Sequence, residues 1–177
     1  VLNGPPVCLT ACSAPEILEF ACFHFILPGE CHVFRSVETF LRPQTIAIVG
    51  ASETGGAGWP KGIYENFAHE DFPARVYLVN PRRDVLWDQK VYPDFASLPE
   101  QIDLAIVIIT AEAIPDVLAE AAHAGLRNAL IFASRFGEGG DDVGAARAAQ
   151  LREICDRTGL RISGPNCMGA ISLPERL

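Results

Sequence analysis

From Val37 onward, short apolar runs rich in β-branched residues alternate with segments of helical periodicity, a pattern typical of βαβ units. Five of these runs predict strands, at residues 45–49, 75–79, 104–109, 129–132 and 160–163, and residues 90–92 predict a short edge strand. Helices are expected between them, at about 59–70, 111–124 and 141–157. Because parallel strands are joined by right-handed crossovers, we predict an α/β fold: a single-domain, Rossmann-like, doubly wound and mainly parallel sheet of about five strands.

Residues 1–35 differ from the rest of the chain, because they show neither period and contain no Lys. Their apolar stretch from Ile17 to Leu27 is eleven residues long and contains Glu19 and His24, so it fits neither a membrane span nor a signal peptide. We therefore expect an N-terminal extension of unknown role at 1–35 and one domain at 36–177.

The charge balance limits the class of partner. The chain has 22 acidic and 14 basic side chains, a formal net charge of -8, whereas nucleic-acid binding depends on a dense cationic face. Neither nucleic acid nor a membrane is expected as a partner. A local positive patch is still predicted after the first strand, from Lys61, Arg75, Arg82, Arg83 and Lys90.

The six cysteines have the spacing of neither a disulfide framework nor a zinc site. Four of them, Cys8, Cys12, Cys22 and Cys31, lie in the first 35 residues. We therefore expect reduced thiols, a cytoplasmic protein and no metal site.

Residues 45–58 form the most informative stretch, because a β-branched strand stops at Gly50 and opens into a glycine-rich loop before a predicted helix. Small residues at such a place let backbone N–H groups face an anion at the positive end of the helix. Gly50, Ala51, Ser52 and Gly55 are therefore candidate phosphate contacts.

The other predicted strands also end in polar or turn-forming residues. The carboxyl ends of parallel strands meet at one edge of a sheet, where doubly wound folds bind their ligands. The candidates at these ends are Asn80, Pro81, Arg82, Arg83, Thr110, Ala111, Ser134, Asn166 and Cys167.

These residues are compatible with two phosphate-bearing ligands, and the sequence does not decide between them. Ser52 interrupts the dinucleotide fingerprint G-x-G-x-x-G, and Asn80 stands where an NAD-binding protein presents an acid to the ribose. NAD is therefore disfavoured. Arg82 and Arg83 suit a ribose that carries its own phosphate, as in NADP or coenzyme A, because a guanidinium pairs bidentately with phosphate oxygens.

The order of several motifs is similar to that of a known family. Ile-Val-Gly-Ala-Ser, Val-Asn-Pro-Arg, Ile-Asp-Leu-Ala-Ile-Val and Gly-Pro-Asn-Cys-Met-Gly follow one another as in the CoA-binding domain of ADP-forming acyl-CoA (acetyl-CoA) synthetases, relatives of the succinyl-CoA synthetase α subunit. The resemblance runs from about Val37 to Leu173, and Gly-Pro-Asn-Cys at 164–167 is its most specific element.

The resemblance implies coenzyme A as the cofactor and gives the candidates their roles. Gly50, Ala51 and Ser52 would hold CoA phosphates, and Arg82 or Arg83 would meet the 3′-phosphate. The nucleotide and pantetheine path would follow Thr110, Ala111 and Ser134, and the thiol end would approach the turn at Asn166 and Cys167.

Two residues need a separate interpretation. Arg135 departs from the resemblance, because a small residue usually precedes Phe-Gly or Phe-Ala at that place. Cys167 has no His near it in the sequence, so we interpret it as a small residue packing a tight turn rather than as a nucleophile. No catalytic residue is predicted.

The resemblance implies that the chain binds CoA as a domain or fragment of an ADP-forming acyl-CoA synthetase, an acid-thiol ligase. Its expected partners are CoA or acyl-CoA and the missing ligase domains or subunits, and a homo-oligomer is left open. Two alternatives also stay open: an NADP-dependent oxidoreductase domain, and a free-standing CoA-binding regulatory module without catalysis. The acyl substrate is undetermined.

By the same resemblance, the phosphorylated histidine and the ATP-grasp module of the family lie outside the matched region. We therefore expect the 177-residue chain to show no ligase turnover on its own. The measurement is ATP formation from acetyl-CoA, ADP and phosphate by the pure chain, and any enzyme-dependent ATP would contradict the expectation.

Overall fold

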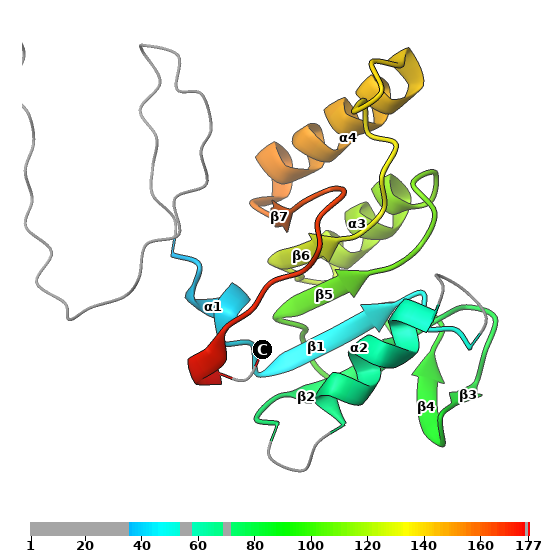
Figure 1. Ribbon diagram of the computed structural model, residues 1–177, viewed down its shortest axis with the longest axis vertical. Helices are drawn as coiled ribbons and strands as arrows, with labels where there is room; N and C mark the ends of the chain where they lie inside the picture. The colour runs from blue at the N-terminus through cyan, green and yellow to red at the C-terminus, as the bar shows by residue number, and fades with distance from the viewer. Residues whose placement is uncertain (1–35, 54–57, 69–71, 176) are drawn as a thin grey trace, which may run out of the picture. The chain divides into compact units, whose positions relative to one another are not determined.

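A computed structural model describes residues 36–53, 58–68, 72–175 and 177, so the expected extension at 1–35 lies outside the described residues. In the described part, the chain forms a seven-stranded sheet in the order β3-β4-β2-β1-β5-β6-β7 (Figure 1). All neighbours pair in parallel except β3 and β4. The strands are β1 Thr45–Val49, β2 Arg75–Val79, β3 Val85–Leu86, β4 Gln89–Tyr92, β5 Leu104–Val107, β6 Asn128–Ile131 and β7 Arg161–Ser163.

Helices cover both faces of the sheet, as a doubly wound fold requires. They are α1 Glu38–Leu41, α2 Trp59–Phe67, α3 Ile114–His123 and α4 Asp142–Thr158, and a 3-10 turn follows at Leu173–Glu175. α3 and α4 pack on one face, whereas α2 packs on the other (Figure 1). The predicted α/β, mainly parallel architecture is therefore confirmed.

β1 is the centre of the sheet, because β2 and β5 pair with its two sides. All five of its residues are buried. Ala47 and Val49 face the layer of α3 and α4, and Ile46 and Ile48 face the layer of α2. Burial on both faces explains why the strand reads as a continuous apolar run rather than as an alternating one.

The sheet has two strands more than the five expected, at the edge formed by the hairpin of β3 and β4. β4 corresponds to the short edge strand predicted at 90–92, whereas β3 was not predicted. β3 has only two residues, Val85 and Leu86, too few to show a period. The connecting residues Trp87 and Asp88 take positive φ values of 52° and 58°, which a hairpin turn needs but which usually fall on Asn-Gly or Asp-Gly. The turn therefore carries no recognisable sequence signal.

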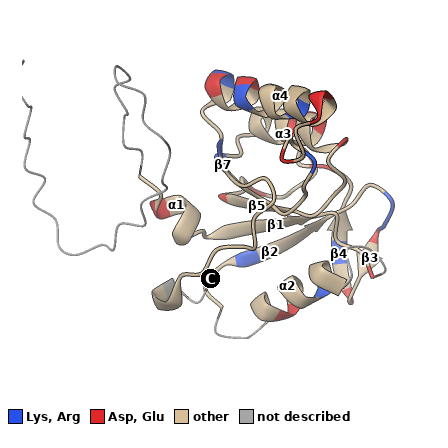
Figure 2. Cartoon of the chain, turned by 45° about the horizontal axis from the view of Figure 1, so that its top comes forward, with Lys and Arg blue, Asp and Glu red and all other residues tan. Residues whose placement is uncertain are grey.

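The boundaries of α3 and α4 lie close to those that the sequence predicts. The Asp141 side chain caps α4 by accepting the Gly144 N–H at 2.6 Å, and Gly159 ends the helix with a φ of 74°. α3 begins at Ile114 rather than 111, after a turn in which the Ala113 N–H donates to the Thr110 carbonyl at 3.1 Å. Charges of both signs are interspersed along the solvent side of α4 (Figure 2).

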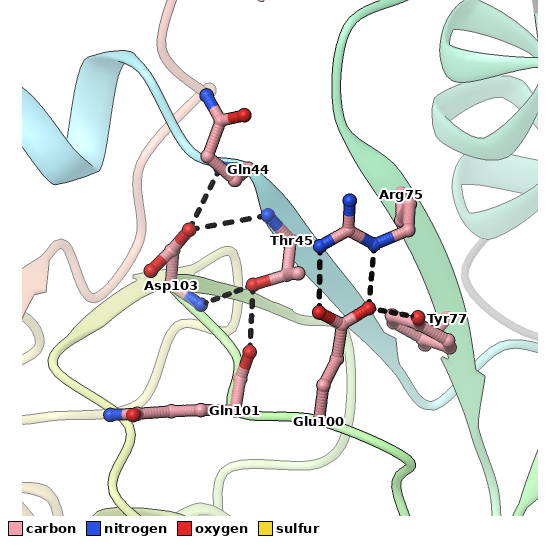
Figure 3. A network of polar contacts seen from close by, with 7 residues as sticks. All are labelled: Gln44, Thr45, Arg75, Tyr77, Glu100, Gln101 and Asp103. Atoms are coloured by element: carbon pink, nitrogen blue, oxygen red, sulfur yellow. Dashed lines mark hydrogen bonds and ion pairs between the residues drawn. The ribbon is translucent and has the colours of Figure 1, made fainter.

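Polar side chains close the amino-terminal edge of the central strands (Figure 3). The Asp103 carboxylate accepts the Gln44 N–H at 2.8 Å and the Thr45 N–H at 3.3 Å. The Thr45 hydroxyl donates to the Gln101 carbonyl at 2.9 Å and accepts the Asp103 N–H at 2.9 Å. The start of β1 is thereby tied to the start of β5.

Arg75 belongs to the same edge, at the start of β2. Its guanidinium donates two hydrogen bonds of 2.6 Å to Glu100, which also accepts the Tyr77 hydroxyl (Figure 3). The prediction that Arg75 joins a positive patch near the glycine loop is therefore wrong, since a strand separates the loop's edge from this one. Arg75 and Arg82 are close in the sequence, but β2 lies between them and places them at opposite edges of the sheet.

No helix in the described ranges is long and apolar enough to cross a membrane.

Two glycines allow a matched test of packing. A Cβ on Gly144, which is buried in α4, would lie 2.3 Å from the Gly137 nitrogen, whereas a Cβ on Gly62, exposed in α2, would meet nothing within 4 Å. We expect Gly144→Ala to lower the free energy of unfolding by about 1–3 kcal/mol and Gly62→Ala to raise it by up to about 1 kcal/mol. Urea unfolding measures both, and equal effects would contradict this packing.

The Glu100 cluster predicts a pH dependence of stability. Hydrogen bonds from Arg75, and then from Tyr77, lower the pKa of Glu100 from 4.5 to about 2. Because the folded-state pKa lies below the unfolded one, the stabilisation is complete above about pH 4.5 and is lost as the pH falls toward 2. We expect Glu100→Gln to be less stable than wild type at neutral pH, with a difference that shrinks over this range. A difference independent of pH, measured by urea unfolding, would refute the assignment.

Candidate functional site

The carboxyl ends of the strands bring the sequence-predicted candidates to one edge of the sheet, opposite the edge shown in Figure 3. Residues 50–52 follow β1, residues 80–83 follow β2, residues 110–111 come after β5, Ser134 after β6, and residues 166–167 after β7. Gly55 lies outside the described residues. The edge is thus built from segments more than a hundred residues apart.

Gly50 turns the chain at the end of β1. It has a φ of +87°, and its N–H donates to the Val79 carbonyl at 2.9 Å. A Cβ at this position would lie 2.4 Å from the Ile108 carbonyl oxygen. Only glycine fits here, because both the backbone conformation and the close approach of the β5 end exclude a side chain.

The first turn of α2 faces the same region without a side-chain cap. Gly58, at the N-cap, is left-handed with a φ of 84° and offers no side chain, and Pro60 occupies the first turn. The free N–H groups of this turn and the helix dipole favour an anion there. This turn, together with Gly50 and Ala51, is the candidate phosphate cradle.

Asn80 joins the loop after β1 to the loop after β2. Its side-chain amide donates to the Ala51 carbonyl at 2.8 Å, and its carbonyl oxygen accepts the Arg82 N–H at 2.9 Å. The predicted contact residue Asn80 therefore has a positioning role, because one side chain holds the cradle and the arginine turn together. The sequence located this residue but gave no sign of its bonds.

The predicted positive patch is smaller than expected. Lys61 pairs with Glu65 at 3.4 Å, and the ammonium of Lys90 lies 4.6 Å from the centre of the Tyr92 ring. Arg82 and Arg83 are exposed, and within the described ranges neither has an ion-pair partner. The basic stretch in the loop that leads to β3 is visible in Figure 2.

The loops after β5 and β6 are connected by a group that the sequence analysis missed. Arg147 of α4, whose side chain is only 15% exposed, donates to Glu112 at 3.0 Å and to the Arg135 carbonyl at 3.2 Å. Arg135 itself has a φ of 80° and approaches Glu112 at 3.4 Å. No local pattern could have found the group, because Glu112 and Arg147 are 35 residues apart.

The two carboxylates of these loops, Glu112 and Glu138, are stabilised in their charged form. A hydrogen bond from its own backbone, followed by the positive charges of Arg147 and Arg135, lowers the pKa of Glu112. Backbone N–H groups, first its own and then that of Phe136 at 2.6 Å, lower the pKa of Glu138. The loops that carry Ala111 and Ser134 are therefore fixed relative to each other.

The turn after β7 is packed against the end of β6. Gly164 has a φ of +103°, and a Cβ there would lie 2.5 Å from the Ile131 carbonyl oxygen. The Asn166 N–H donates to the Ala133 carbonyl at 2.9 Å, and the Cys167 thiol contacts the Ile131 carbonyl at 3.2 Å. This contact agrees with a packing role for the half-buried Cys167.

The comparisons with known proteins agree with the sequence and the fold. Residues 44–172 match a family model described as a CoA binding domain. An ADP-forming acetate–CoA ligase II from Archaeoglobus fulgidus is 36% identical over 73% of this chain and 19% of its own length. A trans-feruloyl-CoA synthase from an unknown prokaryotic organism is 34% identical over 81% of this chain and 20% of its own length.

A solved structure is similar over the same region. The dinucleotide-forming acetyl-coenzyme A synthetase 1 of Ca. Korarchaeum cryptofilum, in complex with phosphate and ADP, superposes with a TM-score of 0.72 at 29% identity. The match covers 80% of this chain and 30% of that one. The chain therefore spans less than a third of each of these relatives. It belongs to the family of CoA-binding domains related to the ADP-forming acyl-CoA ligases.

Proposed function

We propose that the residues at the carboxyl edge bind coenzyme A, with the phosphates of its nucleotide end at β1 and β2 and the pantetheine arm directed toward β7. The bridge made by Asn80 is the observation that carries the proposal. This bridge holds the turn at Gly50 next to the exposed Arg82 and Arg83. The turn itself has no room for a side chain. A diphosphate and a ribose 3′-phosphate need such a pair of neighbouring anion sites.

The width of the edge supports this orientation. β1 and β7 are separated by β5 and β6, so three inter-strand steps of about 4.8 Å give a span of about 14 Å. An extended pantetheine arm is long enough for this distance. The fixed loops after β5 and β6 would form the floor beneath it, and the turn at Asn166 and Cys167 would lie at its thiol end.

The chain carries, in this proposal, the CoA-holding part of an ADP-forming acyl-CoA ligase and works with the ligase's other domains or subunits. The relatives that are named as such ligases support the proposal. An NADP-dependent oxidoreductase domain is not favoured, because residues 44–172 match a CoA binding domain. We also propose a cytoplasmic location, in line with the free thiols of Cys155 and Cys167.

Calorimetric titration with CoA, dephospho-CoA, NADP and NAD tests the assignment of the arginines. We expect CoA to bind most tightly, and the double variant Arg82→Ala/Arg83→Ala to weaken CoA binding by about tenfold or more, since charge-assisted hydrogen bonds to phosphate are lost. Dephospho-CoA, which lacks the 3′-phosphate, should lose little affinity from the same change.

The double variant Arg152→Ala/Arg157→Ala is the matched control, because it removes the same charge from the exposed side of α4. It should leave CoA affinity unchanged. Equal losses for CoA and dephospho-CoA in the first variant would place the 3′-phosphate elsewhere. Absence of CoA binding by the wild-type chain would overturn the proposed function.

A further inference from the structure

An apolar groove lies on the face of the sheet that carries α2. It is bounded by α2, by the buried side chains of Ile106 on β5 and Leu130 on β6, and by the segment after β7, and its volume is about 730 Å³. We call it the apolar groove. Its walls include Trp59, Ile63, Leu130, Phe132, Met168 and Ile171.

The groove has the chemistry of an apolar ligand site. No Asp, Glu, Lys or Arg is among its described lining residues, in which Asn66 supplies the polar side chain. The side chains on its rim are unusually open for their type: Met168 is 83% exposed, Ile171 80% and Trp59 43%. Large apolar side chains exposed together mark a binding surface.

The groove is continuous with the proposed CoA site at two places. Met168 and Gly169 directly follow the turn at Asn166 and Cys167. Trp59 directly follows Gly58, the N-cap of α2, and its ring meets the Phe132 ring edge-on with 5.4 Å between centroids. The end of the groove that is lined by Trp59 and Met168 therefore adjoins both the candidate phosphate cradle and the turn assigned to the thiol end.

We propose that the apolar groove binds the acyl group of a CoA thioester, and that this acyl group is uncharged, either aromatic or a medium-length alkyl chain. The inference rests on the proposed function, because it needs the thiol end near Cys167. An acyl group on that sulfur would lie beside Met168 and Gly169, which line the groove. A dicarboxylic acyl group is excluded, because its free carboxylate would be buried without a cationic partner in the described lining.

The groove is continuous with the proposed CoA site, so the proposal assigns it to a small molecule rather than to a protein segment. Two of the groove's lining side chains are the aromatic rings of Trp59 and Phe132, which suit contact with a flat or flexible apolar group. The groove then runs along the sheet past Ile106 and Leu130, away from the charged loops.

Calorimetric titration of the full chain with CoA, acetyl-CoA, hexanoyl-CoA and succinyl-CoA tests the proposal. Partial burial of the four additional carbons of hexanoyl predicts binding about tenfold tighter than that of acetyl-CoA. Succinyl-CoA should bind no more tightly than acetyl-CoA. Met168→Asp should bring the ratio of hexanoyl-CoA to acetyl-CoA affinity close to one, whereas Val143→Asp, at an exposed apolar position on α4, should leave it unchanged.

Tryptophan fluorescence gives a second readout that does not depend on affinity. Hexanoyl-CoA should change the emission of the wild type and of Trp87→Phe by more than CoA does, and this additional change should vanish in Trp59→Phe. If CoA binds but hexanoyl-CoA binds no more tightly than acetyl-CoA, the groove is not an acyl site and the proposed function stands. If no CoA compound binds, both the function and the groove proposal fail.

Discussion

Two strand ends in this domain close directly on the backbone of a neighbouring strand, and the carboxyl edge depends on that closeness. Gly50 lies against the Ile108 carbonyl and Gly164 against the Ile131 carbonyl, and at both positions a Cβ would approach that oxygen within 2.5 Å. Both glycines also have positive φ values. Because no side chain stands between these turns and the sheet, the turns pack directly on the neighbouring strands, and the backbone of the carboxyl edge is fixed in place.

The two edges of the sheet use their polar side chains differently. At the amino-terminal edge, polar groups are used within the protein: Asp103 accepts backbone N–H groups, and the guanidinium of Arg75 is held by Glu100 (Figure 3). At the carboxyl edge, Asn80 uses its side chain to fix loops, while Arg82 and Arg83 stay exposed. A strongly paired arginine would have to break its bonds to meet a ligand, so the difference between Arg75 and these two residues is in line with the binding edge that we propose.

The sequence predicted the parts of the fold that local physics determines. The central strand at 45–49 was placed correctly because burial on both faces leaves a continuous β-branched run, and α4 was placed because Asp141 and Gly159 are ordinary cap residues. The hairpin of β3 was missed because its turn at Trp87 and Asp88 lacks the usual residues. Bonds that join distant segments, such as Arg147 with Glu112, leave no local pattern. The bridge made by Asn80 and the contact between the rings of Trp59 and Phe132 also join distant segments, so they leave no local pattern either.

An acidic protein can bind a polyanion only if the field at the site is local. The net charge of -8 is spread over the chain, and the acids that begin α4, Asp141 and Asp142, follow β6, which lies three strands from β2. Three strand spacings amount to about 14 Å, whereas the Debye length at physiological salt is about 8 Å. Those acids are therefore largely screened from Arg82 and Arg83, and in the proposed function the affinity for the phosphates depends on two guanidinia, a glycine turn and the start of α2. The proposed acyl site suits the uncharged end of the ligand for a different reason, because no charged side chain is among the described residues that line the apolar groove.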